Sequence, residues 1–330
     1  MERESGEGAG WKNTGLSGCI ASGTDHAGSI KEFADKYPEA KIVASAKAIA
    51  MLPQFFEIAD LADRAVAVKE GEELSLGSHT LQFFMAPMVH WPEVMVEYEK
   101  SEKILFSADG FGKFGALDAD EDWTCEARRY YFNIVGKYGA QVQALLKKAA
   151  TLDIQTICPL HGPILKENLG YYIGKYMTWS SYEPEDDGVL VAYASIHGNT
   201  KKAAEKMKEI LEAKGAKKVA ITDLSRDDMA EAIEDAFRYD KLVLAAASYD
   251  ASVFPCMETF LNKLTNKNYQ NRKIAIIENG SWAPTAARVM KSYVEKMKKI
   301  TLCEKTVTIK SAMKDADVIA MEELADELLA

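Results

Sequence analysis

The second half of the chain alternates between short apolar segments and longer segments with helical spacing. Apolar, β-branched runs predict strands near 188–194, 217–222, 241–247, 273–278 and 304–309. Apolar residues three and four apart predict helices near 200–214, 227–237, 255–265, 283–298 and 315–329. Five such strand–helix repeats predict an α/β fold, a doubly wound parallel sheet that binds ligands beyond the carboxyl ends of its strands.

The first half has a less regular pattern. Its apolar spacing predicts helices at 31–37, 46–56, 123–152 and 167–179, strands at 41–44, 65–68, 103–107 and 154–159, and a β-hairpin at 74–88. Residues 1–20 are rich in Glu, Gly and Ser and have no period of 2 or 3.6, so we expect them to be irregular. The proline-containing acidic run at 183–187 is typical of a linker. These patterns predict a lead-in at 1–21, a first domain at 22–182 and a second domain at 188–330.

Composition narrows the classes of partner. The formal net charge of −10 argues against nucleic acid or an anionic membrane as the main partner. No apolar run approaches the roughly 18 residues of a membrane span, and Met1–Gly18 has no apolar signal segment. The five cysteines form no CxxC pair, which favours buried thiols in a cytoplasmic protein.

The segment Ser195–Thr200 lies between a predicted strand and a predicted helix. Backbone N–H groups at the start of a helix bind anions, and the hydroxyls of Ser195 and Thr200 add further donors for a phosphate. The loop lacks the Gly-Lys-Ser/Thr ending of a Walker loop, and the chain has no GxGxxG motif. A hydroxyl-rich loop without lysine favours the phosphate of flavin mononucleotide (FMN). An ordinary strand-to-helix turn with a capping threonine is the alternative for the loop taken alone.

Two further loops follow strands of the same predicted sheet. Each contains small, turn-forming residues and one aromatic residue, and Tyr249 and Trp282 are therefore candidates to flank a planar ring. The three loops together favour a bound flavin. The predicted cofactor-binding residues are Ser195, Ile196, His197, Gly198, Asn199, Thr200, Ser248, Tyr249, Asp250, Ala251, Ser252, Asn279, Gly280, Ser281 and Trp282.

The first half places histidines and aspartates where predicted strands meet loops. Three of the five histidines belong to this set, which consists of Asp25, His26, His90, Asp109 and His161. Any one of these histidines could be an ordinary surface or hydrogen-bonded residue. Imidazoles and carboxylates that converge from several loops are typical ligands of a zinc or iron site, so the set as a whole predicts a metal site.

Several motifs resemble those of flavodiiron proteins. On the metal side these are Thr24–Ser29, Ala86–Pro92, Leu105–Phe111 and Pro159–Pro163, and on the flavin side Ser195–Thr200, Phe254–Phe260 and Asn279–Arg288. The resemblance implies a metallo-β-lactamase-like αββα domain, incomplete at its N-terminal side, followed by a flavodoxin-like five-stranded domain. It also implies cytoplasmic reduction of O₂ to water, of NO to nitrous oxide, or of both.

The resemblance further implies how the sites would work together. Electrons would enter at FMN from a small donor such as rubredoxin and pass to a di-iron centre, in a head-to-tail homodimer that pairs the flavin of one subunit with the irons of the other. His90 and Asp109 would lie nearest to the substrate. Asp25, His26, Asp109 and His161 would complete one iron site.

The chain departs from the family pattern at the other iron. The family's His-x-Glu-x-Asp-His loop is represented here by Ala21–His26, with Ala21 in place of the first histidine and Gly23 in place of the glutamate. We therefore expect one well-held iron and weak reductase activity, arising either from a truncated gene or from a degenerate family member. The alternatives are an FMN electron carrier whose first domain serves as a dimerisation scaffold and, less favoured, a lactamase-like hydrolase.

Overall fold

A computed structural model describes residues 16–119 and 122–330. The chain divides into two compact units, and each unit is built from two chain segments. Unit 1 contains Met1–Gly112 and Gln141–Ile173, and unit 2 contains Lys113–Ala140 and Gly174–Ala330. No helix in the described ranges has the length and apolar character needed to cross a membrane.

Unit 1 begins with a small parallel sheet in the order β1-β2-β3. Its strands are β1 (Leu16–Cys19), β2 (Lys41–Ser45) and β3 (Ala65–Val68). The helices of this region are α1 (Thr24–Ala27), α2 (Ile30–Lys36), α3 (Ala46–Met51), the 3₁₀ turn η1 (Leu52–Gln54) and α4 (Leu61–Arg64). The predicted helix at 46–56 is thus shorter than expected, because Pro53 lacks the N–H that a longer α-helix needs.

β2 is buried on both faces. Ile42 and Ala44 pack against the apolar sides of α1, α2 and α3. Val43, between them in sequence, points to the other face and packs with residues of a second sheet, including Phe83 and Met95. A strand covered on both sides is nearly continuous in apolar residues, which is why its pattern is so clear in the sequence.

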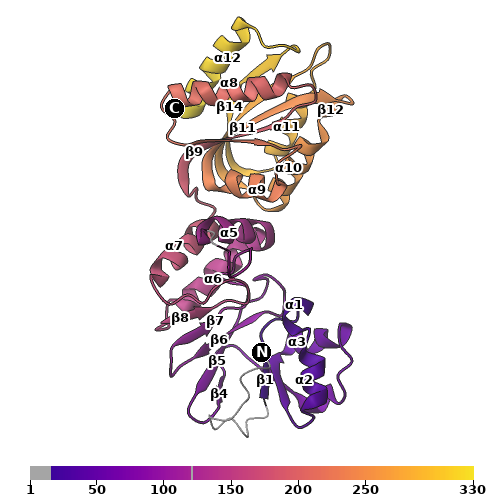
Figure 1. Cartoon of the computed structure of the whole chain (residues 1–330), viewed down its shortest axis with the longest axis vertical. Coiled ribbons are helices and arrows are strands. Elements are labelled where there is room, and N and C mark those ends of the chain that lie inside the picture. Colours follow the sequence, from indigo (N-terminus) through magenta and orange to yellow (C-terminus); the bar gives the residue numbers. More distant parts are fainter. Residues whose placement is uncertain (1–15, 120–121) are drawn as a thin grey trace. The chain divides into compact units, whose positions relative to one another are not determined.

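The second sheet of unit 1 has the order β4-β5-β6-β7-β8 (Figure 1). Its strands are β4 (Glu73–Ser75), β5 (Thr80–Met85), β6 (Met95–Glu99), β7 (Ile104–Phe106) and β8 (Thr156–Cys158). All neighbours are antiparallel except β7 and β8. The central strand β6 was not predicted, because Glu97 and Glu99 interrupt its apolar pattern.

The expectation that residues 1–20 are irregular is wrong for their last part. Leu16–Cys19 forms β1 and pairs in parallel with Lys41–Ala44 of β2. A strand of four residues is too short to show a periodic pattern in the sequence. It forms because the edge of β2 offers N–H and C=O groups with which it can pair. The rest of the expected lead-in, residues 1–15, lies outside the described residues.

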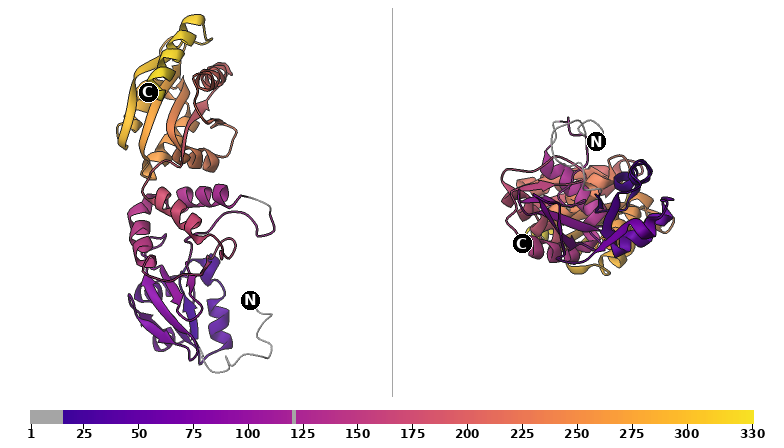
Figure 2. Two further views of the ribbon diagram at one scale, coloured as in Figure 1. Left: turned by 90° about the vertical axis from the view of Figure 1, so that its left-hand side faces the viewer. Right: turned by 90° about the horizontal axis from the view of Figure 1, so that it is seen from below.

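Unit 2 contains the predicted parallel sheet, in the order β10-β9-β11-β13-β14. The strands are β9 (Asp186–Ala194), β10 (Val219–Asp223), β11 (Tyr239–Tyr249), β13 (Gln270–Asn279) and β14 (Lys298–Ile309), and the short β12 (Ser252–Val253) pairs with β11. The helices are α8 (Asn199–Ala213), α9 (Met229–Arg238), α10 (Pro255–Asn266), α11 (Ala286–Val294) and α12 (Asp315–Leu329). Helices cover both faces of this sheet (Figure 2). This strand order is that of flavodoxin-like folds. The strands stay parallel, but β10 is added on one side of β9, and β11, β13 and β14 are added on the other side.

Part of a helical segment from the first half of the sequence, up to Ala140, belongs to unit 2, and the rest, from Gln141, belongs to unit 1. The single helix predicted at 123–152 is divided into α5 (Trp123–Tyr130), a π-helical turn η2 (Tyr131–Val135), a 3₁₀ turn η3 (Gly136–Tyr138) and α6 (Gly139–Ala149). Phe132 of the π-helical turn stacks on Phe237 of α9, with ring centroids 4.1 Å apart. The break thus coincides with the packing of η2 against α9. The helix after β8, α7, spans Leu169–Ser180.

The acidic run predicted as a linker is part of this packed region. Both Arg128 of α5 and Trp179 of α7 donate hydrogen bonds to Glu185, and Arg128 also forms a short ion pair with Glu234 of α9. β9 starts within the same run, at Asp186. Burial disfavours a charged guanidinium, but the two carboxylates outweigh burial and raise the pKa of Arg128.

Candidate functional site

Two parallel strands of unit 1 deliver Asp109 and His161 to the same place. Phe106 and Cys158 are register partners at the ends of β7 and β8. Asp109 and His161 each follow their strand end by three residues, and a hydrogen bond from Leu160 N to Ala108 O, 2.8 Å long, joins the two loops. The carboxyl ends of parallel neighbours meet at one sheet edge, so the two side chains converge.

Asp25 and His26 lie on the single helical turn α1. Gly23 O accepts bonds from His26 N and Ala27 N at 3.0 and 2.7 Å, which closes the turn. Glu93 holds the preceding residue, because its Oε1 accepts bonds from Ser22 N at 3.1 Å and from Ser22 Oγ at 2.5 Å. Glu93 is buried and was not predicted as part of the site.

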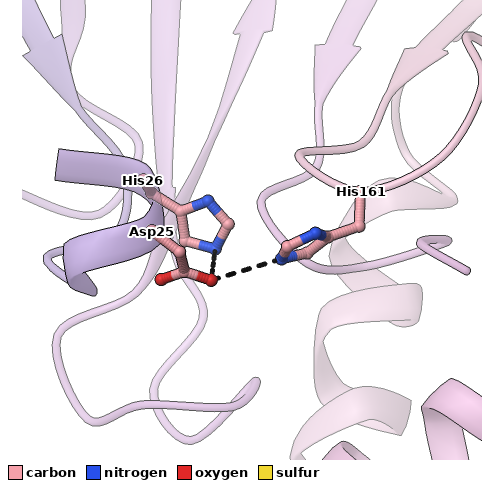
Figure 3. A group of neighbouring side chains, drawn as sticks. All are labelled: Asp25, His26 and His161. Atoms are coloured by element: carbon pink, nitrogen blue, oxygen red, sulfur yellow. Dashed lines mark ion pairs between the residues drawn. The ribbon is translucent and has the colours of Figure 1, made fainter. Parts of the chain in front are cut away.

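The structure brings the predicted metal ligands together around Asp109. Figure 3 shows Asp25, His26 and His161, whose ligand atoms all lie within 4.8 Å of one another. Asp109 Oδ1 lies 3.0 Å from His26 Nε2 and 3.6 Å from His161 Nε2. Its other oxygen, Oδ2, lies 3.2 Å from Nε2 of the remaining predicted ligand, His90. Asp109 therefore stands between two groups of ligands.

The electrostatics of Asp109 fit a cation. Its side chain is 3% exposed, and Oδ1 has no hydrogen-bond partner of acceptable direction among the described residues. Burial by itself raises the pKa of Asp109, but His26 and His90 outweigh it and hold the pKa well below its usual range. Asp109 conversely raises the pKa of His26 against the effect of burial. A buried carboxylate oxygen that faces imidazole nitrogens without bonding to them is the arrangement expected of ligands for a shared metal ion.

On the Oδ2 side of Asp109, few side chains are available as metal ligands. Ala21 and Gly23 are buried and have no side-chain ligand atom. A Cβ atom at Gly23 would lie 2.7 Å from Oδ1 of Asp25, so the present loop leaves little room for a side chain there. His90 and Asp109 Oδ2 are thus the predicted ligands left at this position.

Unit 2 contains a cavity of about 540 Å³ at the carboxyl ends of β9, β11 and β13. All predicted cofactor-binding residues line it except Gly198 and Ser252. Gly198 has a φ of +86° and directs the chain into α8, and its N–H donates to Ser195 Oγ at 3.1 Å. Ser252 contributes its carbonyl, which accepts a 2.7 Å bond from Thr285 Oγ1. The predicted loops therefore meet at one site.

Some of these side chains also form hydrogen bonds that hold the loops of the cavity in place. Ser248 Oγ accepts bonds from Thr285 N and Ala286 N, at 2.8 and 3.2 Å, and so caps α11. Asn279 exchanges two bonds with the backbone of Ser311, which lies beyond β14. Ser311 and Thr285 line the cavity and were not predicted. The position of Ser311 just past a fifth parallel strand is the signal that would have found it.

The cavity suits a flavin by size and by chemistry. Its volume lies in the range of small-molecule sites. The start of α8 presents backbone N–H groups next to the hydroxyls of Ser195 and Thr200, which fits a phosphate. Tyr249 is 44% exposed and Trp282 is 93% exposed at the cavity, so both rings are accessible to a planar ligand.

Comparison with known proteins finds a family model for each of two parts of the chain. Residues 22–162 match the model of the ODP family beta lactamase, and residues 190–308 match that of the flavodoxin domain. The chain belongs to the flavodiiron protein family. It is 24% identical to a nitric oxide reductase of Moorella thermoacetica, over 93% of this chain and 78% of the relative. Flavodiiron proteins use FMN and two iron ions.

Two further comparisons place this flavodiiron chain among its relatives. It is 34% identical to an uncharacterized protein of Methanocaldococcus jannaschii, over 61% of this chain and 53% of the relative. The chain thus spans about half the length of that relative. Rubredoxin oxygen:oxidoreductase from Desulfovibrio gigas shares the fold, with a TM-score of 0.86 and 22% identity over 95% of this chain and 80% of that chain.

Proposed function

We propose that this protein is a flavodiiron oxidoreductase that reduces O₂, NO or both with electrons passed through FMN. The proposal rests mainly on one observation, which is that the chain contains both a candidate flavin site and a candidate metal site. One is the cavity at the strand ends of unit 2, and the other is the set of imidazoles and carboxylates around Asp109 in unit 1. A small redox protein of the rubredoxin type is the proposed electron donor, and a head-to-tail homodimer is the proposed assembly.

In the flavin site, each loop has a distinct task. The loop at Ser195–Thr200 binds the phosphate through backbone N–H groups and hydroxyls. Tyr249 and Trp282, both accessible at the cavity, would pack against the flavin ring and shield it from water. Ser248, through its cap on α11, and Ser311, through its bonds to Asn279, hold the other two loops in place. FMN bound there would accept and release electrons one at a time.

In the metal site, Asp25, His26, His161 and Asp109 Oδ1 would hold one iron ion. Iron in such an oxygen and nitrogen ligand set supplies open coordination positions for O₂ or NO. Asp109 keeps its negative charge at neutral pH, because the neighbouring imidazoles stabilise it. His90 and Asp109 Oδ2 face the position where ligands are few. We therefore propose weak binding of a second iron and low reductase activity.

An FMN electron carrier is the second candidate function. The absence of side-chain ligand atoms at Ala21 and Gly23 favours this function. If the metal site binds little iron, the flavin is the only redox centre that remains active. Reduction of the flavin by a donor, with no consumption of O₂ or NO, would identify the carrier. Sustained consumption of either gas would identify the reductase.

The first test concerns the flavin. We expect the purified chain to be yellow and to lose FMN when Asn199 and Thr200 are both replaced by alanine, because both belong to the first turn of α8 at the phosphate loop. Flavin content per chain, measured by absorbance, is the readout. Asn262→Ala on the exposed side of α10 is the matched control and should keep its flavin. A colourless protein that ignores added FMN would contradict the proposal.

A further inference from the structure

Glu97 of β6 occupies a position that is otherwise apolar. Its register partners on the neighbouring strands are Phe83 and Phe106. Met95, two residues earlier and therefore on the same face of the strand, belongs to the core between the two sheets of unit 1. Glu97 is only 8% exposed, so its carboxyl group lies at the edge of this core.

The carboxyl group of Glu97 has no evident partner. Within the described part of the chain, Oε1 of Glu97 is buried and makes no hydrogen bond. The backbone of β1 approaches it closely, because a Cβ atom at Gly18 would lie 3.0 Å from that oxygen. Burial raises the pKa of Glu97 to about 7. A large part of the population is thus charged and unpaired at neutral pH, which costs free energy.

Glu97 lines a cavity of about 410 Å³ in unit 1. The walls are mostly apolar and include Ile20, Ile30, Phe33, Phe106 and Leu160. This combination of apolar walls and one buried carboxyl group is typical of a site for a small ligand.

The other titratable groups near Glu97 leave its charge uncompensated. His26 of α1 also lines the cavity, but its Nε2 lies 3.0 Å from Asp109. Cys19 of β1 donates its thiol proton to Ala21 O, and burial together with Glu93 and Glu97 raises its pKa to about 11, so it stays neutral. Glu93, before β6, accepts two bonds from Ser22.

We propose that this cavity binds a small primary alkylammonium ion, with its ammonium group on Glu97 and its alkyl chain against Ile30 and Phe33. A charge-assisted hydrogen bond from the ammonium group would give Oε1 of Glu97 a partner and neutralise the buried charge. The apolar walls would bury the alkyl chain and remove it from water. An inorganic divalent cation fits less well, because calcium and magnesium require several oxygen ligands that apolar walls do not offer.

The test measures binding of n-butylammonium chloride to the full-length protein by calorimetry at pH 7.5. We expect butylammonium to bind at least about tenfold more tightly than 1-butanol, because only the cation pairs with Glu97, and we expect butyrate not to bind. Glu97→Gln should abolish the preference for the cation. Glu99→Gln is the matched control on the same strand, since Glu99 bonds to Ser101 N and Glu102 N and does not line the cavity.

Three outcomes would overturn the inference. These are equal binding of butanol and butylammonium, displacement of butylammonium by equimolar calcium, and absence of binding. If Glu97→Gln does not fold, Gly18→Ala replaces it as the test variant. Its methyl group would crowd Oε1 and should weaken butylammonium binding without changing butanol binding. Unchanged butylammonium binding in Gly18→Ala would then refute the site.

Discussion

At the scale of single residues, Asp109 links the two halves of the metal site. Its Oδ1 faces His26 and His161, and its Oδ2 faces His90. The sequence predicts these residues as a set because each follows or precedes a strand. It does not predict how the two oxygens are shared, since that depends on side-chain directions in the folded loops.

Metal content follows from the ligands at these positions. We expect about one iron per chain after anaerobic loading with ferrous iron, because one side of Asp109 has a full set of ligands and the other does not. Ala21→His combined with Gly23→Glu should raise iron content toward two and increase reductase activity. The new Cβ at Gly23 would crowd Oδ1 of Asp25, and this 63% exposed carboxylate can turn Oδ1 outward while Oδ2 keeps its place beside His26 and His161.

Colorimetric iron analysis per chain is the measurement for this variant. Ala21→Leu combined with Gly23→Gln supplies comparable bulk without the imidazole and the carboxylate, and should stay near one iron. Two irons in the unmodified chain would mean that other residues supply the missing ligands.

The raised pKa of Glu97 predicts that the free energy of unfolding depends on pH. Its folded-state pKa of about 7 exceeds the ordinary value of 4.5, so the folded state holds the proton longer than the unfolded state. The stabilisation is complete below pH 4.5 and is lost as pH rises through 7. Its loss should lower the free energy of unfolding by about 3 kcal/mol at most.

Urea unfolding between pH 5 and 8 measures this effect. Glu97→Gln should make the decrease smaller, because a glutamine does not ionise, while Glu234, whose pKa burial also raises to about 7, still titrates in this range. Glu73→Gln, which replaces an exposed partner of Lys100, should keep the slope of the unmodified protein. Parallel curves for the Glu97 variant and the unmodified protein would show that Glu97 does not titrate in this range.

At the scale of elements, local pattern was enough for unit 2 and less so for unit 1. Strands β9, β11 and β13 are buried on both faces, so their runs of Val, Ile, Leu and Ala identify them without tertiary information. β6 was missed because Glu97 and Glu99 look solvated, whereas backbone N–H groups bind Glu99 and the core surrounds Glu97. β1 was missed because only its pairing with β2 makes it a strand.

The cap on α11 gives a test at this scale. Ser248→Ala removes the acceptor for Thr285 N and Ala286 N, and should lower the free energy of unfolding of unit 2 by about 1 kcal/mol. FMN affinity should fall as well, because the loop before α11 lines the flavin cavity. Urea unfolding and flavin fluorescence are the measurements.

A matched control is Ser292→Ala, which removes an exposed hydroxyl from α11 without touching the cap. It should change neither quantity. If Ser248→Ala also leaves both unchanged, water replaces the hydroxyl and the cap contributes little.

At the scale of the whole molecule, the packing of α5 against α9 extends the flavodoxin-like region. Arg128 and Glu234 both have side chains only 2% exposed, and Glu185 is 10% exposed. Sequence pattern gave no sign of this arrangement, because charged residues at helical spacing usually face solvent.

Arg128→Met should destabilise unit 2 by roughly 3–5 kcal/mol, since it leaves the buried carboxylate of Glu234 without its cationic partner, whereas Glu185 keeps its bonds from Lys175 and Trp179. Thermal unfolding followed by circular dichroism is the measurement. Arg129→Met, which breaks ion pairs with exposed carboxylates, should cost less than about 1 kcal/mol. Adding Glu234→Leu to Arg128→Met should restore much of the loss. An equally unstable double variant would assign the effect to lost packing of the arginine stem.

The division of the chain into units has a practical consequence. The backbone passes from one unit to the other after Gly112, after Ala140 and after Ile173. A protease that cuts one of these connections would give two fragments with no covalent bond between them, and the fragments would stay together only through the packing inside the units that they share. A gene fragment that starts at residue 188 would encode the parallel sheet without Phe132 and Arg128, and would turn Phe237 and Glu234 of α9 toward solvent. Flavin-domain fragments are therefore better designed to retain residues 113–140.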